Sequence, residues 1–214
     1  MKSLEREIAE KLLQIKAVKL QPANPFTWAS GWKSPIYCDN RKTLSYPDLR
    51  TMIKVAFTRL INENFPETRV IAGVATGGIA QGALVADAMD LPFVYVRSAP
   101  KGHGLENLIE GDLNPGSKVI IIEDLISTGG SSLKVVQAIR NHGCEVEGMI
   151  AVFTYGFPVA EQQFKEASVQ LITLSNYDAV IEEALQINYI SKDDIAVLQA
   201  WRRNPADYYG FYQY

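Results

Sequence analysis

Acidic and hydroxyl side chains follow one another closely in residues 119–131, which read V-I-I-I-E-D-L-I-S-T-G-G-S. The four β-branched residues predict a strand that is buried on both faces, and Glu123 and Asp124 follow at its carboxyl end. The segment from Ser127 to Ser131 then offers backbone N–H groups, hydroxyls and the N-terminus of a predicted helix, all of which favour a phosphate. The two carboxylates are placed to accept hydrogen bonds from sugar hydroxyls or to help hold a divalent cation. Together these groups are typical of a site for a phosphorylated sugar.

Plainer interpretations of this run remain open. A glycine-rich turn between a strand and a helix needs no ligand, and acids that close a strand are often only solvated. A triphosphate-binding loop is excluded, because it would end in Gly-Lys-Ser or Gly-Lys-Thr and the chain contains neither. The acidic pair and the hydroxyls exceed what a turn requires. We therefore predict that this loop binds a terminal monophosphate and that the acids bind a ribose diol.

Two further loops carry groups that suit a pyrophosphate. Segment 98–117 follows Arg97 and contains Lys101 and His103, which gives two fixed cations and one titratable ring. A connection of this length is usually a lid or a disordered segment, and a lid with these charges would neutralise a leaving pyrophosphate and exclude water. The alternative is a polar loop whose charges only solvate it. Residues 75–78, Ala-Thr-Gly-Gly, would let the backbone approach a pyrophosphate closely.

Segment 20–46 is rich in Pro, Asn, Ser and Gly and contains scattered aromatic residues. This composition predicts extended or short-strand structure. Trp28, Trp32 and Tyr37 are suited to sandwich a flat ring whose edges are read by the backbone. A small hydrophobic flap that merely covers the sheet is the plainer interpretation.

The elements that must position these loops alternate along the chain from residue 70. The predicted strands are 70–74, 93–97, 119–123, 146–153 and 169–174, and the predicted helices between them are 78–89, 131–142 and 158–167. Strands that alternate with helices of about ten residues indicate parallel βαβ units, with helices on both faces of one sheet. Ligands of such sheets bind beyond the carboxyl ends of the strands. The three loops should therefore meet at one edge.

Further helices are expected outside this alternation. Apolar residues at helical spacing predict a helix over residues 4–15, and Ser45 and Pro47 mark the start of another that extends to about residue 64. Helical patterns return at 179–185 and 193–201, with Ser191 as the N-cap of the latter. The remaining C-terminal residues are aromatic without periodicity.

Composition limits the classes of protein that this chain can represent. Its 214 residues are 47% hydrophobic, enough for a core, and the formal net charge of −3 gives no general attraction for nucleic acid. Cys38 and Cys144 have no metal-like spacing and need no disulfide, as is usual in a reducing cytosol. The acidic start does not resemble a signal peptide, and no apolar run is long enough to span a membrane. We expect a cytoplasmic protein with one domain over residues 1–214, bound neither to nucleic acid nor to a membrane.

The run 119–131 resembles the 5-phosphoribosyl-1-pyrophosphate (PRPP) signature of the type I phosphoribosyltransferases. Other segments narrow the resemblance to the orotate phosphoribosyltransferase family. Residues 26–31 (FTWASG) and 34–39 (SPIYCD) are similar to that family's orotate-side segment, and the cations of segment 98–117 fall where its catalytic lid lies. The likeness covers roughly residues 3–205, and the motifs appear in the family's order.

This resemblance implies the type I phosphoribosyltransferase fold, a parallel α/β sheet with helices on both faces, in which segment 20–46 contributes to a small N-terminal flap, or hood. It implies transfer of the 5-phosphoribosyl group from PRPP to orotate, which gives orotidine 5′-monophosphate and pyrophosphate. Mg²⁺ is the implied cofactor and would bridge pyrophosphate and ribose oxygens; no residues of the chain are predicted to hold a metal by themselves. The implied assembly is a homodimer in which each lid serves the partner's site.

Residue roles follow from the same resemblance. The catalytic residues would be Lys101, His103 and Asp124, and orotate would be bound by Ser127, Ser30 and Lys33. PRPP would be bound by Arg97, Lys101, His103, Glu123, Asp124, Leu125, Ile126, Ser127, Thr128, Gly129, Gly130 and Ser131. Carboxylates beside the reacting carbon would stabilise the oxocarbenium-like charge that develops as pyrophosphate departs.

The chain departs from the family pattern at four positions where some members carry a cation. Ala29 replaces a lysine, Gly77 replaces a lysine of the first glycine loop, and Ser98 follows Arg97 where the lid often reads Arg-Lys. Residues 154–156, Thr-Tyr-Gly, also lack the arginine that binds the orotate carboxylate in some members. Ser127 and backbone amides would then take part of that role.

Two rival functions were weighed. A phosphoribosyltransferase for a purine or uracil would share the phosphate loop, but the sequences of the lid and the N-terminal segment favour orotate. A regulator that only senses PRPP or nucleotides would often add a DNA-binding domain or a basic surface. The short N-terminus and the net charge of −3 supply neither.

Overall fold

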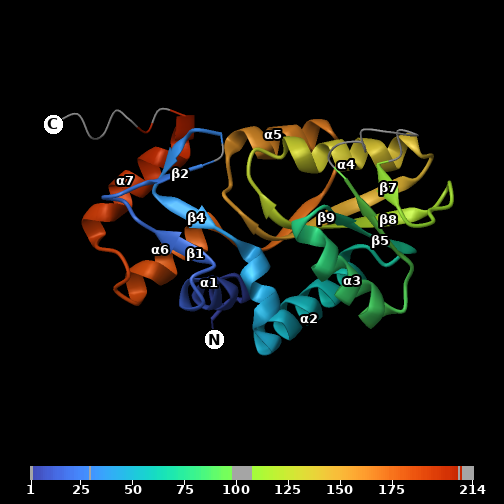
Figure 1. Cartoon of the computed structure of the whole chain (residues 1–214), viewed down its shortest axis with the longest axis horizontal. Helices are drawn as coiled ribbons and strands as arrows, with labels where there is room; N and C mark the ends of the chain where they lie inside the picture. Colours follow the sequence, from blue (N-terminus) through green and yellow to red (C-terminus); the bar gives the residue numbers. More distant parts are fainter. Residues whose placement is uncertain (1, 29, 98–107, 207, 209–214) are drawn as a thin grey trace.

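A computed structural model describes residues 2–28, 30–97, 108–206 and 208 of the chain. A six-stranded sheet lies at its centre, with helices on both faces (Figure 1). In spatial order its strands are β10 (Leu171–Asn176), β9 (Glu145–Thr154), β8 (Lys118–Ile126), β5 (Val70–Val74), β6 (Phe93–Val96) and β7 (Ile109–Glu110). The first five are parallel to one another and β7 is antiparallel to β6. The predicted α/β architecture is confirmed.

The helices form a layer on each side of this sheet. The layer containing α4 and α5 covers one face, and the other helices cover the opposite face or extend beyond it (Figure 1). Their bounds are α1 Leu4–Gln14, α2 Pro47–Asn64, α3 Gly77–Met89, α4 Gly130–Asn141, α5 Pro158–Glu166, α6 Tyr177–Gln186 and α7 Lys192–Arg203. Each was predicted, and Ser191 caps α7 through a capping box with Asp194 as expected.

The central strands are buried on both faces, as their β-branched runs predicted. Every residue of β5 is buried, and the four residues of β8 from Val119 to Ile122 are 0% exposed. Side chains alternate between the two faces of a strand. One face of this sheet accordingly joins the core beside α1, α2 and α6, and the other joins the core beside α4 and α5.

Several predicted boundaries differ from the observed ones by a few residues, such as that of strand 169–174, which is β10 (Leu171–Asn176), and two of the differences bear on the site. Strand β8 does not end at Glu123 but continues to Ile126, because Leu125 and Ile126 pair with Phe153 and Thr154 of β9. The acidic pair therefore lies within the strand rather than after it.

The long connection predicted over residues 98–117 is also interrupted. Ile109 and Glu110 return to the sheet as β7 and pair with Val96 and Tyr95. Ile109 is only 5% exposed, so a short apolar stretch was enough to add an edge strand.

The N-terminal segment forms two small antiparallel pairs beside the sheet. Strand β1 (Val18–Leu20) pairs with β4 (Ile36–Cys38), and β2 (Phe26–Thr27) pairs with β3 (Lys33–Ser34). A 3₁₀ helix, η1 (Asn40–Ser45), connects them to α2. We call residues 18–45 the flap; its short strands match the prediction for segment 20–46, whereas the 3₁₀ helix η1 was not predicted.

Aromatic side chains fasten the flap to the C-terminal helix. The rings of Trp28 and Trp201 meet edge to face at 5.6 Å between centroids, and Trp28 also lies 5.1 Å from Tyr155. Trp201 Nε1 donates to the Lys33 carbonyl at 3.2 Å, and Tyr208 Oη donates to the Pro22 carbonyl at 3.0 Å. This contact explains why α7 lies next to β2 in Figure 1.

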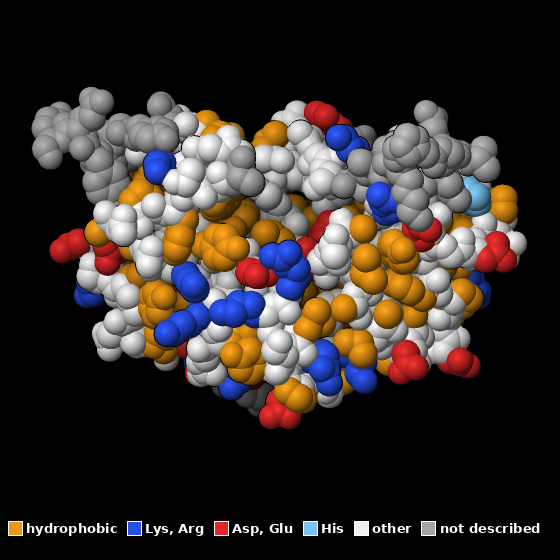
Figure 2. Space-filling view, in the orientation of Figure 1, with side chains coloured by type: hydrophobic (Ala, Val, Ile, Leu, Met, Phe, Trp, Pro, Cys, Tyr) orange, Lys and Arg blue, Asp and Glu red, His pale blue; other side chains and the backbone are white. Residues whose placement is uncertain are grey.

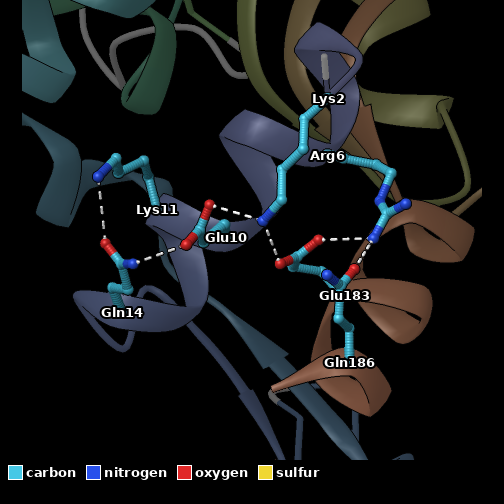
Figure 3. Close-up of polar contacts among 7 residues, drawn as sticks. All are labelled: Lys2, Arg6, Glu10, Lys11, Gln14, Glu183 and Gln186. Carbon is cyan, nitrogen blue, oxygen red and sulfur yellow. Dashed lines mark hydrogen bonds and ion pairs between the residues drawn. The ribbon is translucent and has the colours of Figure 1, made fainter.

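A buried carboxylate joins the first helix to the sixth (Figure 3). The Glu183 side chain is 0% exposed and accepts hydrogen bonds from Lys2 Nζ at 2.6 Å and from Arg6 Nη2 at 3.0 Å. Arg6 also donates to Gln186 on the same helix. Burial alone would raise the pKa of Glu183, but these two hydrogen bonds outweigh burial and hold the pKa below its ordinary value.

Replacing Glu183 with Gln is expected to lower the free energy of unfolding by about 2 kcal/mol, because two charge-assisted hydrogen bonds are weakened. For a chain of this size that corresponds to a fall in Tm of about 4–8 °C. Thermal unfolding at neutral pH measures it, with the exposed neighbour Glu182→Gln as the control. A carboxylate whose pKa is lowered stabilises the fold above its ordinary pKa and loses that contribution on acidification. The difference between E183Q and the parent chain should therefore shrink as the pH falls, and a constant difference would contradict the assignment.

Candidate functional site

A cleft of about 390 Å³ lies beyond the carboxyl ends of β5 and β8. Figure 2 shows basic and acidic side chains meeting near the middle of this side of the molecule, between apolar areas. The cleft is lined by four pieces of chain: the end of the flap, the end of β5 with the loop after it, the acidic end of β8 and the start of α4. The lining residues are Cys38, Asp39, Arg41, Val74, Ala75, Thr76, Gly77, Glu123, Asp124, Leu125 and Ser131.

Glu123 is held against the N-terminus of α4. Its side chain is 5% exposed, and its two carboxylate oxygens accept from the Asp124 backbone N–H and from Ser132 Oγ, both at 2.9 Å. Burial raises the pKa of Glu123 well above its ordinary value, and the neighbouring charge of Asp124 raises it further. The carboxylate is therefore fixed in orientation and unusually ready to take up a proton.

Asp124 lies on the opposite side of the strand, against the loop after β5. A Cβ atom at Gly77 would overlap the Asp124 carboxylate, so this close approach requires glycine. A Cβ atom at Gly78 would likewise overlap the Ile122 carbonyl oxygen. The two glycines thus let α3 begin directly beside the acidic pair. Ala75 and Thr76, which precede them, are joined by a cis peptide bond.

A buried polar chain connects the flap to Asp124. Asn40 is 2% exposed, and its Nδ2 donates to the Asp124 carbonyl at 2.6 Å. Thr43 Oγ1 donates to the Asn40 carbonyl at 2.6 Å and accepts from Gln81 Nε2 of α3 at 3.2 Å. Cys38 Sγ donates to Asn40 Oδ1 at 3.3 Å. These bonds hold the flap, α3 and β8 in register at the cleft.

The loop predicted to bind a phosphate joins β8 to α4. Gly129 takes a left-handed conformation with φ of +87°, and α4 begins at Gly130. Thr128, Gly130 and Ser131 are exposed there, so backbone amides and hydroxyls are presented at a helix N-terminus. Ser127 is half-buried.

The last two residues of β8, Leu125 and Ile126, differ in their access to the cleft. The Ile126 side chain is 0% exposed within the core, so only its backbone could meet a ligand. Leu125 is half-buried and lines the cleft.

The predicted orotate-side residues Ser30 and Lys33 are not among the residues that line this cleft. Ser30 is exposed in the turn of the β2–β3 hairpin, and Lys33 Nζ donates to Thr27 Oγ1 at 2.7 Å. Of the aromatic residues proposed to sandwich a ring, Trp28 packs on Tyr155 while Tyr37 is 40% exposed.

Of the residues predicted to form a lid, Arg97 is described by the structure. Arg97 follows β6, where its guanidinium lies 3.7 Å from Glu110 Oε1 of β7. Arg97 does not line the cleft. Lys101 and His103 lie outside the described residues, and their roles stay predictions.

The sequence interpretation did not single out Arg41, which lines the cleft, or the buried residues Asn40, Thr43 and Gln81 behind it. One signal was present: Gln81 lies one turn before Val85, on the face of α3 that is buried. A polar residue on an apolar helix face needs a buried partner. The partner, Thr43, could not have been named without the fold.

The cleft fits a divalent cation only with help from a ligand. Within the described residues no group of three or more His, Cys, Asp or Glu side chains could hold a metal ion. Mg²⁺ is commonly bound through one or two carboxylates together with substrate phosphates. Asp124, at the surface of the cleft, offers one such carboxylate, whereas both oxygens of Glu123 already accept hydrogen bonds.

Comparison with known proteins connects this cleft to a family. Residues 48–188 match the phosphoribosyl transferase domain model. The orotate phosphoribosyltransferase of Bacteroides fragilis is 70% identical over 206 residues, covering 96% of this chain and 97% of the relative. That of Listeria innocua is 54% identical, covering 95% and 97%.

Solved structures share the fold. The orotate phosphoribosyltransferase of Aeropyrum pernix superposes with a TM-score of 0.75 at 25% identity, covering 86% of this chain and 99% of that one. The UMP synthase of Leishmania donovani gives 0.76 at 23% identity, covering 92% of this chain and 42% of that one. No helix among the described residues combines the length and apolar character needed to cross a membrane.

Proposed function

The chain belongs to the orotate phosphoribosyltransferase family and joins orotate to PRPP in pyrimidine biosynthesis, and we propose that it does so in the cleft between the flap, α3 and the acidic end of β8. The products are orotidine 5′-monophosphate and pyrophosphate. The observation that carries this assignment is the meeting of Glu123 and Asp124 with the loop 127–131 at one edge of the sheet.

We propose that PRPP binds with its 5′-phosphate on loop 127–131. The exposed amides and hydroxyls at the start of α4 suit a dianion without a lysine. The ribose then lies over the end of β8, where its diol donates to the carboxylates of Glu123 and Asp124. The pyrophosphate extends toward residues 75–77, whose backbone lines the same cleft.

The carboxylates then stabilise the positive charge that develops at the reacting carbon. As the bond to pyrophosphate breaks, positive charge develops on the ribose ring, and Asp124 stabilises it from a fixed position. The fixed position is supplied by Gly77 on one side and by the Asn40 hydrogen bond to the Asp124 backbone on the other. Mg²⁺, when bound, would supply neutralisation of charge on the pyrophosphate.

We propose that Arg97, Lys101 and His103 form a lid that neutralises pyrophosphate and excludes water, with His103 as a candidate proton donor. The protein would be a homodimer in which each lid closes the partner's cleft. Orotate would be held by Ser127 of loop 127–131 and by Ser30 and Lys33 of the flap. The whole chain would work as one domain with the flap as its cover.

We further propose a cytoplasmic location. The cysteines Cys38 and Cys144 are both free thiols, which suits a reducing compartment.

The direct test is the loss of orotate absorbance when PRPP and Mg²⁺ are added to the purified protein. Orotate is expected to be consumed, while uracil, adenine and hypoxanthine are left unchanged under the same conditions. Preferential conversion of one of these other bases would reassign the substrate.

Replacing Ser132 with Ala is expected to move the acid limb of the pH profile of kcat/KM for PRPP to higher pH. The hydrogen bond from Ser132 opposes the effects of burial and of Asp124 on the pKa of Glu123. Without it the pKa of Glu123 rises further, so the ionised form that accepts a ribose hydroxyl is lost at a higher pH. Ser132→Thr keeps a hydroxyl and should restore the profile. An acid limb that stays in place in S132A would show that Glu123 does not set it.

A further inference from the structure

The charges in the cleft do not match the ligand proposed for it. Three of its lining residues are acids, Asp39, Glu123 and Asp124, and Arg41 is the single cation among the described lining residues. A pyrophosphate group would be repelled by such a surface unless positive charge were placed close to it. The loop after β5 adds backbone groups but no charged side chain.

Position 77 cannot supply that charge. Any side chain there would begin with a Cβ atom inside the space of the Asp124 carboxylate. A cationic side chain at position 77 would therefore displace the Asp124 carboxylate. Besides the lid and the Mg²⁺ proposed above, positive charge can come from the flap, whose Arg41 lines the same cleft.

Arg41 is held in place on that wall. The backbone before it is tied down by the Asp39 N–H, which donates to the Ala17 carbonyl at 2.8 Å, and by Asn40, which bonds to Asp124. The Arg41 Nε donates to Asp39 Oδ1 at 2.7 Å. This bond uses Nε, so the two terminal nitrogens can donate to a ligand. The planar guanidinium fork matches phosphate oxygens well.

We propose that Arg41 binds the pyrophosphoryl group of PRPP from the flap side of the cleft, opposite the loop of residues 75–77. The inference rests on the proposed function, because it assigns a residue to that reaction's phosphate donor. The flap would then contribute a positive charge to PRPP binding as well as cover the cleft. The Asp39 carboxylate then acts as a positioning group that aims the guanidinium.

The test compares Arg41→Gln with the parent protein by two readouts. R41Q is expected to raise KM for PRPP by about 10- to 100-fold, the loss usual for a charge-assisted hydrogen bond, and to leave KM for orotate within about twofold. Calorimetric titration with inorganic pyrophosphate and Mg²⁺ should show a similar loss of affinity without any turnover. R41K should recover part of it, because lysine keeps the charge but not the fork.

Arg59→Gln is the matched control. Arg59 is 56% exposed and pairs with Glu63 on its own helix, much as Arg41 is 59% exposed and pairs with Asp39. Arg59 is not a lining residue of the cleft, so its loss should change neither readout. Circular dichroism of each variant would establish that the fold is retained.

The double variant D39N/R41Q removes one positive and one negative charge, so it leaves the net charge of the cleft unchanged. It therefore distinguishes a direct contact between Arg41 and pyrophosphate from an effect of net charge. If Arg41 touches pyrophosphate, the double variant stays impaired. Recovery of pyrophosphate affinity in D39N/R41Q, or unchanged affinity in R41Q, would overturn the assignment while the parent protein still converts orotate. A parent protein that binds pyrophosphate through Arg41 but never consumes orotate would instead overturn the proposed reaction alone.

Discussion

Lys101→Ala is expected to lower kcat by about 10²–10³-fold, the largest loss of any single substitution in this chain, because a cation aimed at the charge of the leaving group acts mainly in the transition state. KM for orotate should change little. Steady-state loss of orotate absorbance measures the effect. Lys165→Ala, on the exposed side of α5, is the control and should behave as the parent protein does. An unchanged turnover in K101A would remove Lys101 from the catalytic set.

The same variant tests whether the lid acts on the partner's cleft. In a mixture with Asp124→Asn, each mixed dimer would contain one cleft with both Asp124 and a partner lid intact. An equal mixture should then regain about one quarter of the parent activity, since half of the dimers are mixed and each has one working site. Subunit exchange must first be completed, for example by mixing before refolding. A mixture that stays inactive after proven exchange would mean that each lid serves its own subunit.

Gly77→Ala is expected to reduce kcat/KM for PRPP by about 10²-fold with little change in Tm. The added methyl group would occupy the position of the Asp124 carboxylate, and a displacement of about 1 Å in a catalytic group is enough for such a loss. The alanine costs the fold little, because position 77 is the first residue of α3 and helix starts tolerate alanine. Steady-state kinetics and thermal unfolding of the same sample separate the two effects.

A double-mutant cycle shows whether the loss in G77A passes through the acid. In the Asp124→Ala background the methyl group meets no carboxylate, so G77A should cost almost nothing more. The two substitutions should therefore be strongly non-additive. If their effects on kcat/KM multiply instead, Gly77 serves the ligand directly and the contact with Asp124 is incidental.

Elements with strong local periodicity could be predicted from the sequence. Strand β5 was predicted with the bounds that it has, because five consecutive apolar residues are long enough for a buried strand and too few for a helix. The start of α7 was predicted from Ser191, since an N-cap residue is a local signal. Both depend on neighbours in the sequence only.

Elements that depend on a distant partner were predicted poorly. The two residues of β7 have no periodicity of their own and form a strand only because β6 presents an open edge. The three added residues of β8 exist because β9 continues beside them. Neither partner can be identified from a local window of sequence.

The same distinction between local and long-range determinants applies to the residues of the site. Glu123 and Asp124 were predicted to lie beside the phosphate loop because the motif is contiguous, and the structure brings them there. Asn40 is 84 positions away from Asp124, and its hydrogen bond to that residue depends on how the flap docks. Arg41 enters the cleft by the same route. Functional residues that form a contiguous motif can be predicted from the sequence, whereas those that the fold brings together from distant positions cannot.

The attachment of the flap to α7 has a consequence for synthesis on the ribosome. Trp201 and Lys33, which share a hydrogen bond, are 168 positions apart. A nascent chain exposes the flap well before it exposes α7, the helix that fastens it. The sheet and its acidic edge can therefore begin to assemble during translation, before the contact between the flap and α7 can form. Premature termination before Trp201 would leave a polypeptide with loop 127–131 complete but with a flap that lacks its contacts to α7.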